Sequence, residues 1–175
     1  MKIRSCLLIL ILACMCAVTG CRSAAPTDIK GETQAPVMMQ SDFPDEPPHL
    51  YVTCAESTVR AWRGTYSWEI RRPLGLGEAV MADSHHPLDI IDEIPFVAAD
   101  STTEVSLTFA EHPDSITVNC YRPDGDPGAV HSTVKINGTT FSLSEEDMLY
   151  EVIAEWNSDS RAYSGCVYYA FRTEQ

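Results

Sequence analysis

The stretch GCVYYAF at residues 165–171 decides the fold of this chain. Val167, Tyr169 and Phe171 recur at a period of two, which is the pattern of a half-buried β-strand. A strand of this kind needs an antiparallel neighbour to satisfy its backbone hydrogen bonds. The preceding stretch 149–156, LYEVIAEW, is the candidate for that neighbour.

The stretch 149–156 fits two structures. A helix beginning with the capping-box pattern SEED at 144–147 would place five apolar side chains on one face: Met148, Leu149, Val152, Ile153 and Trp156. A strand would place four on one face: Tyr150, Val152, Ala154 and Trp156. We expect a strand over 149–156, with at most a helical turn at 144–148, because the strand at 166–172 needs a partner.

The same alternation recurs along the chain between turn residues. It is clearest at 50–54, 66–70, 105–109 and 116–120. Seven or eight short strands without a long helix predict an all-β domain, an immunoglobulin-like β-sandwich, over 49–175.

Two of the segments that connect the predicted strands have sequence features that indicate their structure. Asn137-Gly138 is the strongest short hairpin signal in the chain, and apolar alternation lies on both sides of it. The acidic segment 82–95 contains prolines and is expected to cross from one sheet to the other.

The first twenty residues form a segment of a different kind. Lys2 and Arg4 precede Cys6–Val18, an uncharged apolar run of 13 residues, which is the length of a signal-peptide core and shorter than the ~20 residues of a membrane-spanning helix. The step Val18-Thr19-Gly20-Cys21 resembles the lipobox of bacterial lipoproteins. This resemblance implies a signal peptide over 1–20 and acylation of Cys21 at the extracytoplasmic face of the cell membrane. An ordinary secretory leader cleaved nearby and an uncleaved anchor are the alternatives.

Residues 21–48 are predicted to be a flexible tether. They are rich in Ala, Ser, Thr, Gln and Pro and have neither a helical nor a strand period. A flexible coil of this length spans roughly 25–30 Å. The domain is expected to begin at His49, after Pro47-Pro48.

The charge balance restricts the partners. The net charge is −13, and it becomes −15 when Lys2 and Arg4 leave with the leader. An acidic protein is repelled by phosphate backbones and by anionic lipids, so nucleic acid is excluded and the membrane is reached through the lipid anchor. An envelope protein, a peptide or a glycan are the ligands that remain open.

Three cysteines remain in the predicted domain: Cys54, Cys120 and Cys166. They can form at most one disulfide, and buried thiols are the other possibility. Cys166 follows Gly165 in an apolar run, so it is expected in the core rather than as a nucleophile.

The segment 82–95 also holds the densest group of potential metal ligands: Asp83, His85, His86, Asp89, Asp92 and Glu93. Adjacent histidines point in different directions on an extended chain, so we expect a solvated loop and no metal. Asp124 and Asp126 lie in a turn without the EF-hand pattern. Ser84 is not in a Gly-x-Ser-x-Gly motif, so we assign no catalytic residue and expect no cofactor.

The aromatic residues are expected to be mainly core. Their period-two spacing favours burial, and an exposed aromatic face for a carbohydrate or a peptide is the alternative. The residues concerned are Tyr66, Trp68, Trp156, Tyr168 and Tyr169.

Three stretches of the domain resemble small extracytoplasmic β modules of Firmicutes lipoproteins and of antibiotic-sensor-type membrane metallopeptidase tails. They are GTYSW at 64–68, ADS at 82–84 with HPL at 86–88, and YEVIAEW at 150–156. The resemblance implies a sensor-side module and carries no catalytic residue, since the metallopeptidase zinc motif His-Glu-x-x-His is absent from this chain. We therefore expect a membrane-anchored binding or sensing module of unknown ligand; an envelope hydrolase and a structural envelope protein are the alternatives.

Overall fold

The computed structural model describes residues 45–71, 77–99, 103–143, 145 and 147–174. The predicted signal peptide, Cys21 and most of the predicted tether lie outside these residues. No helix in the described part of the chain is both long and apolar enough to span a membrane.

The described residues form eleven strands and one short 3-10 helix. In chain order these are β1 (Leu50–Cys54), β2 (Ser57–Arg60), β3 (Trp62–Ile70), β4 (Glu78–Ala82), the 3-10 helix η2 (Ile91–Glu93), β5 (Phe96–Ala98), β6 (Glu104–Phe109), β7 (Ser115–Tyr121), β8 (Ser132–Val134), β9 (Thr140–Ser142), β10 (Leu149–Trp156) and β11 (Tyr163–Glu174).

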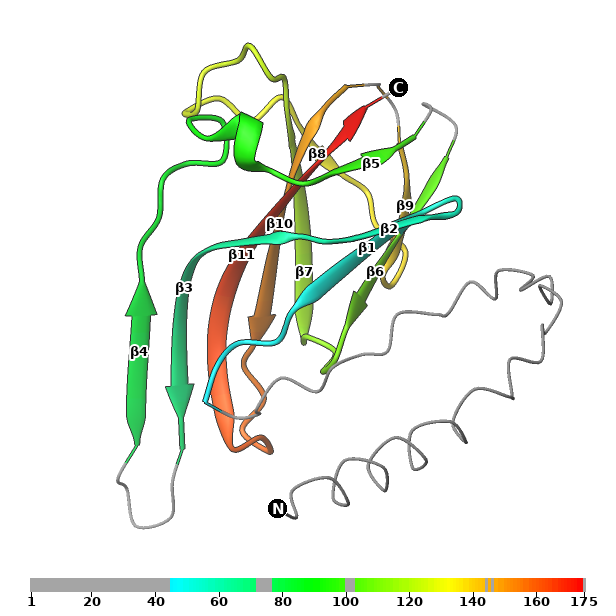
Figure 1. The fold of residues 1–175 in the computed structure, drawn as a ribbon. Helices are drawn as coiled ribbons and strands as arrows, with labels where there is room; N and C mark the ends of the chain where they lie inside the picture. The colour runs from blue at the N-terminus through cyan, green and yellow to red at the C-terminus, as the bar shows by residue number, and fades with distance from the viewer. Residues whose placement is uncertain (1–44, 72–76, 100–102, 144, 146, 175) are drawn as a thin grey trace, which may run out of the picture. The chain divides into compact units, whose positions relative to one another are not determined.

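The strands form two sheets (Figure 1). The smaller has the order β2-β1-β6-β9, and the larger has the order β4-β3-β11-β10-β7-β8, with β5 added alongside β11. The β5–β11 pair is parallel, and the other strand pairs are antiparallel. The predicted all-β sandwich is confirmed.

The predicted pairing of the last two strands is also confirmed. β10 pairs with β11 from Leu149 opposite Arg172 to Trp156 opposite Gly165. Its other edge pairs with β7, so β10 lies inside the larger sheet. Because both edges are hydrogen-bonded, 149–156 is a strand and the helical alternative is excluded.

One hydrophobic core fills the space between the two sheets. The smaller sheet contributes residues such as Val52 and Leu107, and the larger contributes Val152 and Phe171, all at most 2% exposed. Aromatic rings cross the interface: the ring centroids of Phe109 and Trp156 lie 6.0 Å apart. Burial of these alternating side chains holds the sheets together, as the sequence pattern predicts.

Two short strands, β4 and β5, were not expected from the sequence, and they contribute to the count of eleven rather than seven or eight. β4 lies at the edge of the larger sheet, and its Met81 is 82% exposed. β5 has only three residues. Neither strand has enough buried alternation to produce a period-two signal.

The Asn137-Gly138 turn forms, but it does not join a paired hairpin. Backbone hydrogen bonds between Asn137 and Thr140 close the turn, and Gly138 adopts a positive φ of 62°. The preceding β8 pairs with β7 in the larger sheet, whereas the following β9 pairs with β6 in the smaller one. The turn therefore moves the chain from one sheet to the other.

The expectation that segment 82–95 crosses between sheets is wrong. It leaves β4 and returns to β5, and both strands belong to the larger sheet (Figure 1). On the way, Leu88, Ile90 and Ile94 pack on the outer face of that sheet, against Tyr121 and neighbouring side chains. The apolar residues of this segment cover a second, smaller cluster instead of leading to the other sheet.

The chain just before β1 is fixed to the domain. Pro47 and Pro48, the last residues of the predicted tether, are buried. The Arg63 guanidinium donates a hydrogen bond of 2.8 Å to the Pro47 carbonyl, and the Tyr169 hydroxyl donates to the Pro48 carbonyl.

Candidate functional site

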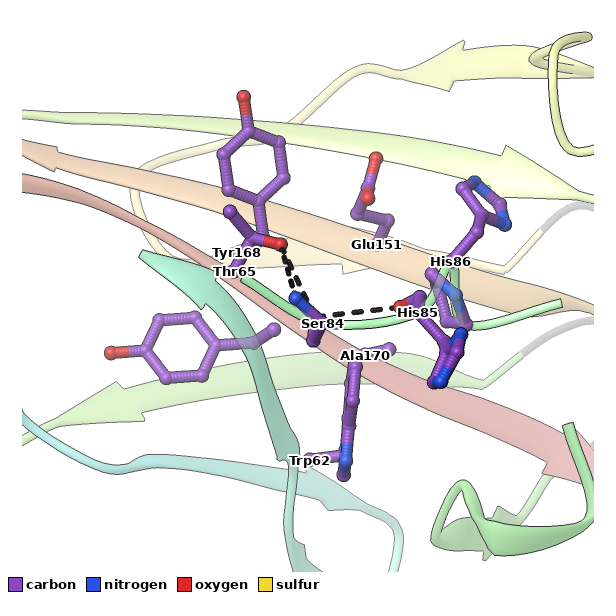
Figure 2. Close-up of a pocket in the computed structure, with 10 residues that line it drawn as sticks. Trp62, Thr65, Ser84, His85, His86, Glu151, Tyr168 and Ala170 are labelled. Atoms are coloured by element: carbon purple, nitrogen blue, oxygen red, sulfur yellow. Dashed lines mark hydrogen bonds between the residues drawn. The ribbon is translucent and has the colours of Figure 1, made fainter. Parts of the chain in front are cut away.

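A pocket of about 280 Å³ lies between residues 84–87 and the outer face of the larger sheet (Figure 2). We call it the outer-face pocket. Its lining residues are Trp62, Thr65, Ser84, His85, His86, Pro87, Glu151, Tyr168, Tyr169 and Ala170. The sheet positions most of these side chains, so the pocket rests on paired strands rather than on loops alone.

Glu151 is the one acidic side chain in this lining. It lies on β10 and is only 8% exposed. Its Oε2 accepts hydrogen bonds from the Tyr121 hydroxyl at 3.1 Å and from the Asn119 amide at 3.4 Å. Both donors lie on the neighbouring strand β7, and Asn119 is directly opposite Glu151 in the register.

The donors are held in the orientation that Glu151 requires. The Thr133 hydroxyl donates to Asn119 Oδ1 at 3.3 Å, which directs the Asn119 NH₂ group toward the carboxylate. Burial, followed by the negative charge of Glu151, raises the pKa of Tyr121 to about 12. The Tyr121 hydroxyl therefore stays protonated at neutral pH and remains a donor.

The charge of Glu151 has no cationic partner among the described residues. The ion pairs in this part of the chain join other groups. The second carboxylate oxygen, Oε1, accepts no hydrogen bond from a described residue, whereas Oε2 accepts two. Oε1 is not enclosed by the described residues, so it is the part of the carboxylate that a group bound in the pocket can reach.

The His86 ring is held by the backbone N–H of Leu88 and by an aromatic neighbour. Its Nδ1 accepts a hydrogen bond of 3.2 Å from the Leu88 N–H, which places the proton of the neutral ring on Nε2. The ring packs edge-on against Tyr121, with centroids 5.3 Å apart. His85, the preceding residue, is exposed.

Ser84 joins the rim of the pocket to β3. Its Oγ lies 3.2 Å from Thr65 Oγ1, and its backbone N–H donates to the same oxygen at 3.3 Å. The Ser84 hydroxyl is also 3.4 Å from the His85 carbonyl, to which it donates (Figure 2). These contacts fix the segment over the sheet.

A serine, two histidines and a glutamate thus line one pocket, but they are not linked as a catalytic relay. Among the described residues, no hydrogen bond joins Ser84 to a histidine side chain or to Glu151. Nδ1 of His86 already accepts a hydrogen bond from the backbone N–H of Leu88. A serine hydrolase needs its nucleophile bonded to a base that a third group orients, and this arrangement provides binding groups instead.

The acidic and histidine-rich segment is not arranged as a metal centre. Within the described ranges, no group of three or more His, Cys, Asp or Glu side chains could hold an ion. In the other candidate turn, Asp126 Oδ1 accepts the Gly128 N–H at 2.8 Å, which stabilises the turn.

The aromatic residues divide between the two sides of the larger sheet. Trp68, Trp156 and Tyr169 are in the core, at most 1% exposed, as expected. Tyr66 packs at the edge of that core. Tyr168 faces outward and lines the outer-face pocket, which fits the alternative of an aromatic binding face.

Sequence reasoning missed several lining residues of this pocket, Trp62 and Glu151 among them. Glu151 has the position of an ordinary outward polar residue in an alternating strand. Its hydrogen-bond partners, Tyr121 and Asn119, are 30 and 32 residues away in the sequence. No local pattern reveals that contact.

The cysteine expectations are met in part. None of the three described cysteines forms a disulfide, and Cys54 and Cys120 are buried. The expectation of Cys166 in the core is wrong, because its neighbour Val167 faces inward and Cys166 therefore faces outward. It lines a second hollow of about 450 Å³ that shares Thr65 and Tyr168 with the outer-face pocket. Burial raises the pKa of Cys166, which opposes a role as a nucleophile.

No protein-family model, curated protein or solved structure matches the chain. The resemblance to Firmicutes lipoprotein modules therefore stays a prediction from the sequence, and the pocket carries the functional argument.

Proposed function

We propose that the chain is an extracytoplasmic lipoprotein, anchored through Cys21, whose β-sandwich domain binds a small ligand or a single side chain in the outer-face pocket. The anchor is inferred from the apolar leader and the lipobox-like step before Cys21. The binding role is inferred from the pocket.

One observation carries the binding role: Glu151 is a buried carboxylate, lines a pocket, and has one oxygen without a hydrogen bond from any described residue. That oxygen is open to the pocket and is not enclosed by the described residues, so a ligand bound there can reach it and pair with the charge. The surroundings are aromatic and apolar with a few converging polar groups, which is the usual composition of a small-ligand site. The volume of about 280 Å³ is close to the lower end of the ~300–1,000 Å³ range of such sites.

The three tryptophans provide a direct test of binding. Trp68 and Trp156 are in the core, whereas Trp62 lines the pocket. Purified full-length lipoprotein in detergent would be titrated with a mixed panel of amino acids, amines, short peptides and sugars while tryptophan emission is recorded. We expect a saturable change with at least one class of probe, and its loss in Trp62→Phe. No saturable change across the panel, together with no rise in melting temperature, would contradict the binding role.

The anchor is tested separately. Replacement of Cys21 by Ala should move the protein out of the detergent phase or leave a precursor that retains its leader. Unchanged processing and unchanged detergent partitioning would exclude lipidation at Cys21.

A second candidate function, an envelope hydrolase, is favoured by one observation: Ser84, His86 and Glu151 line the same pocket. A fluorophosphonate probe distinguishes the two functions. The binding role predicts no labelling of Ser84. Labelling that disappears in Ser84→Ala and in His86→Ala would favour the hydrolase.

A further inference from the structure

We propose that the outer-face pocket takes an organic cation with N–H donors, an alkylammonium or guanidinium group, whose charge pairs with Glu151. This inference rests on the proposed binding role and gives its ligand a chemical class. The same chemistry occurs in free amines and in the side chains of lysine and arginine, and the experiment below separates these two sources.

The Glu151 carboxylate is only partly bonded by its neighbours. Tyr121 and Asn119 are neutral donors and both use Oε2. No described residue pairs a positive charge with this carboxylate or donates a hydrogen bond to Oε1. A cationic N–H group would supply a hydrogen bond to Oε1 and the missing charge together, and such charge-assisted bonds are about twice as strong as neutral ones. A neutral ligand would cover this oxygen without supplying a positive charge.

The charges of the chain also favour a cationic ligand. Two arginines of the larger sheet are paired with other carboxylates: Arg63 lies 3.0 Å from Glu46, and Arg172 lies 2.6 Å from Glu174. Glu155 also points outward from β10, and the whole chain carries a net charge of −13. The net charge of the chain therefore favours the approach of cations over that of anions.

The lining of the outer-face pocket is also suited to an organic cation. Trp62 and Tyr168 offer aromatic surface, and Ala170 is a small apolar residue on β11, opposite Trp62 in the register. Aromatic rings attract a cation, and apolar walls accept the methylene stem of a long basic side chain. The hydroxyls of Thr65 and Ser84 line the same pocket and can accept further N–H groups.

A metal ion fits this site less well than an organic cation. Divalent ions need several oxygen, nitrogen or sulfur ligands at short distances. Among the described residues, no group of three or more His, Cys, Asp or Glu side chains meets that need. One carboxylate with aromatic walls instead suits a monovalent organic cation.

Calorimetric titration of the full-length lipoprotein in detergent tests the proposal. The free cations would be cadaverine and agmatine, and the side-chain mimics Nα-acetyl-lysine amide and Nα-acetyl-arginine amide. Nα-acetyl-glutamine amide is the neutral control, and choline is a cation without N–H donors. We expect the N–H cations to bind at least about tenfold more tightly than either control, because a charge-assisted hydrogen bond exceeds that factor.

Two matched variants locate the interaction. Glu151→Gln removes the proposed partner, and Glu155→Gln removes an equal charge from the same face of the same strand without touching the pocket lining. Affinity for the preferred cation should fall at least about tenfold in Glu151→Gln and less than about threefold in Glu155→Gln. If Glu151→Gln fails to fold, the difference in affinity between the cationic and the neutral probes for the wild-type protein still tests the proposal.

The possible outcomes distinguish the class of ligand from the binding role itself. Preference for cadaverine and agmatine indicates a free amine, and preference for the acetylated amides indicates a basic side chain in a peptide. The proposal of a cationic ligand would be overturned if a neutral probe bound as tightly as the cations, or if Glu151→Gln left the affinity for the cations unchanged. Either result would leave the binding role intact. Absence of binding by every probe, neutral ones included, would overturn the cation and count against the binding role as well.

Discussion

The two faces of β10 are built from alternate residues of one strand, but they are covered in different ways. The inner residues Tyr150, Val152, Ala154 and Trp156 are at most 1% exposed, because the smaller sheet packs over all of them. On the outer face, Leu149 packs in a cluster with residues of the segment after β4, and Glu151 lines the pocket beside that segment. A strand face that is covered by a whole sheet contributes only to the hydrophobic core. A strand face that is covered by one irregular segment can also contribute to a binding site.

The largest difference between the faces is expected in thiol reactivity. Cys54 and Cys120 are buried between the sheets, whereas Cys166 is partly exposed on the outer face. Inner thiols react only when the domain opens, so we expect Cys166 to be labelled about a hundredfold faster or more under native conditions. Mass spectrometry after timed labelling measures this. Similar rates for all three would mean that the two faces are equally accessible.

Tryptophan replacement should show the same contrast in stability. Trp156 is fully buried, so Trp156→Ala should lower the free energy of unfolding by about 3–5 kcal/mol. Trp62 is only partly buried in the outer-face pocket, and Trp62→Ala should cost much less. Urea unfolding of both variants provides the comparison. Equal losses would show that the outer face is as important to the fold as the core.

A smaller loss is expected where β3 and β11 approach closely. A Cβ on Gly165 would meet the Ser67 carbonyl oxygen and would lie 2.6 Å from Trp68 Cε3. Gly165→Ala should therefore destabilise the domain by about 1–3 kcal/mol, since the strands must separate to accept it. Gly128, where only an Asp126 side-chain oxygen lies near at 3.4 Å, is a suitable control. A neutral Gly165→Ala would contradict the register of these strands.

The smallest effect on stability is expected in the turn that follows β10 in the chain. Asp114 Oδ2 accepts the backbone N–H groups of Asn157 and Ser158 at 2.7 and 2.8 Å, and these bonds lower the pKa of Asp114 below 3.8. A lowered pKa gives a stabilisation that is complete above pH 3.8 and is lost as the pH falls through the folded value.

Asp114→Asn should therefore be slightly less stable than the wild type at pH 7, and its stability should fall less steeply below pH 3.8. Unfolding curves at pH 7 and pH 3 test this. Parallel acid limbs for both proteins would show that Asp114 does not carry the effect.

The inner face could be predicted from the sequence because alternation is local. Val167, Tyr169 and Phe171 identify β11, and β11 identifies β10 as its partner. The failures have physical reasons. β4 is an exposed edge strand with two alanines and no buried alternation, and segment 82–95 uses its apolar residues to cover the same sheet rather than to reach the other one.

The site was harder to predict than the core. The histidine and serine positions at 84–86 were singled out, but as a solvated loop, and the structure places them around a pocket. Glu151 was overlooked because its importance comes from contacts with Tyr121 and Asn119 across a strand pair and from the segment that covers it. These are tertiary contacts, and a period-two pattern contains no information about them.

The unfolding free energy of Glu151→Gln tests most directly whether the outer face is kept for a ligand rather than for the fold. Glutamine keeps an oxygen for Tyr121 and Asn119 and removes the buried charge, so the variant should be as stable as the wild type without ligand, or more stable. Glu155→Gln, on the same face, serves as the control. A loss of about 2 kcal/mol or more in Glu151→Gln alone would show that the carboxylate stabilises the sheet, and would contradict a site reserved for a ligand.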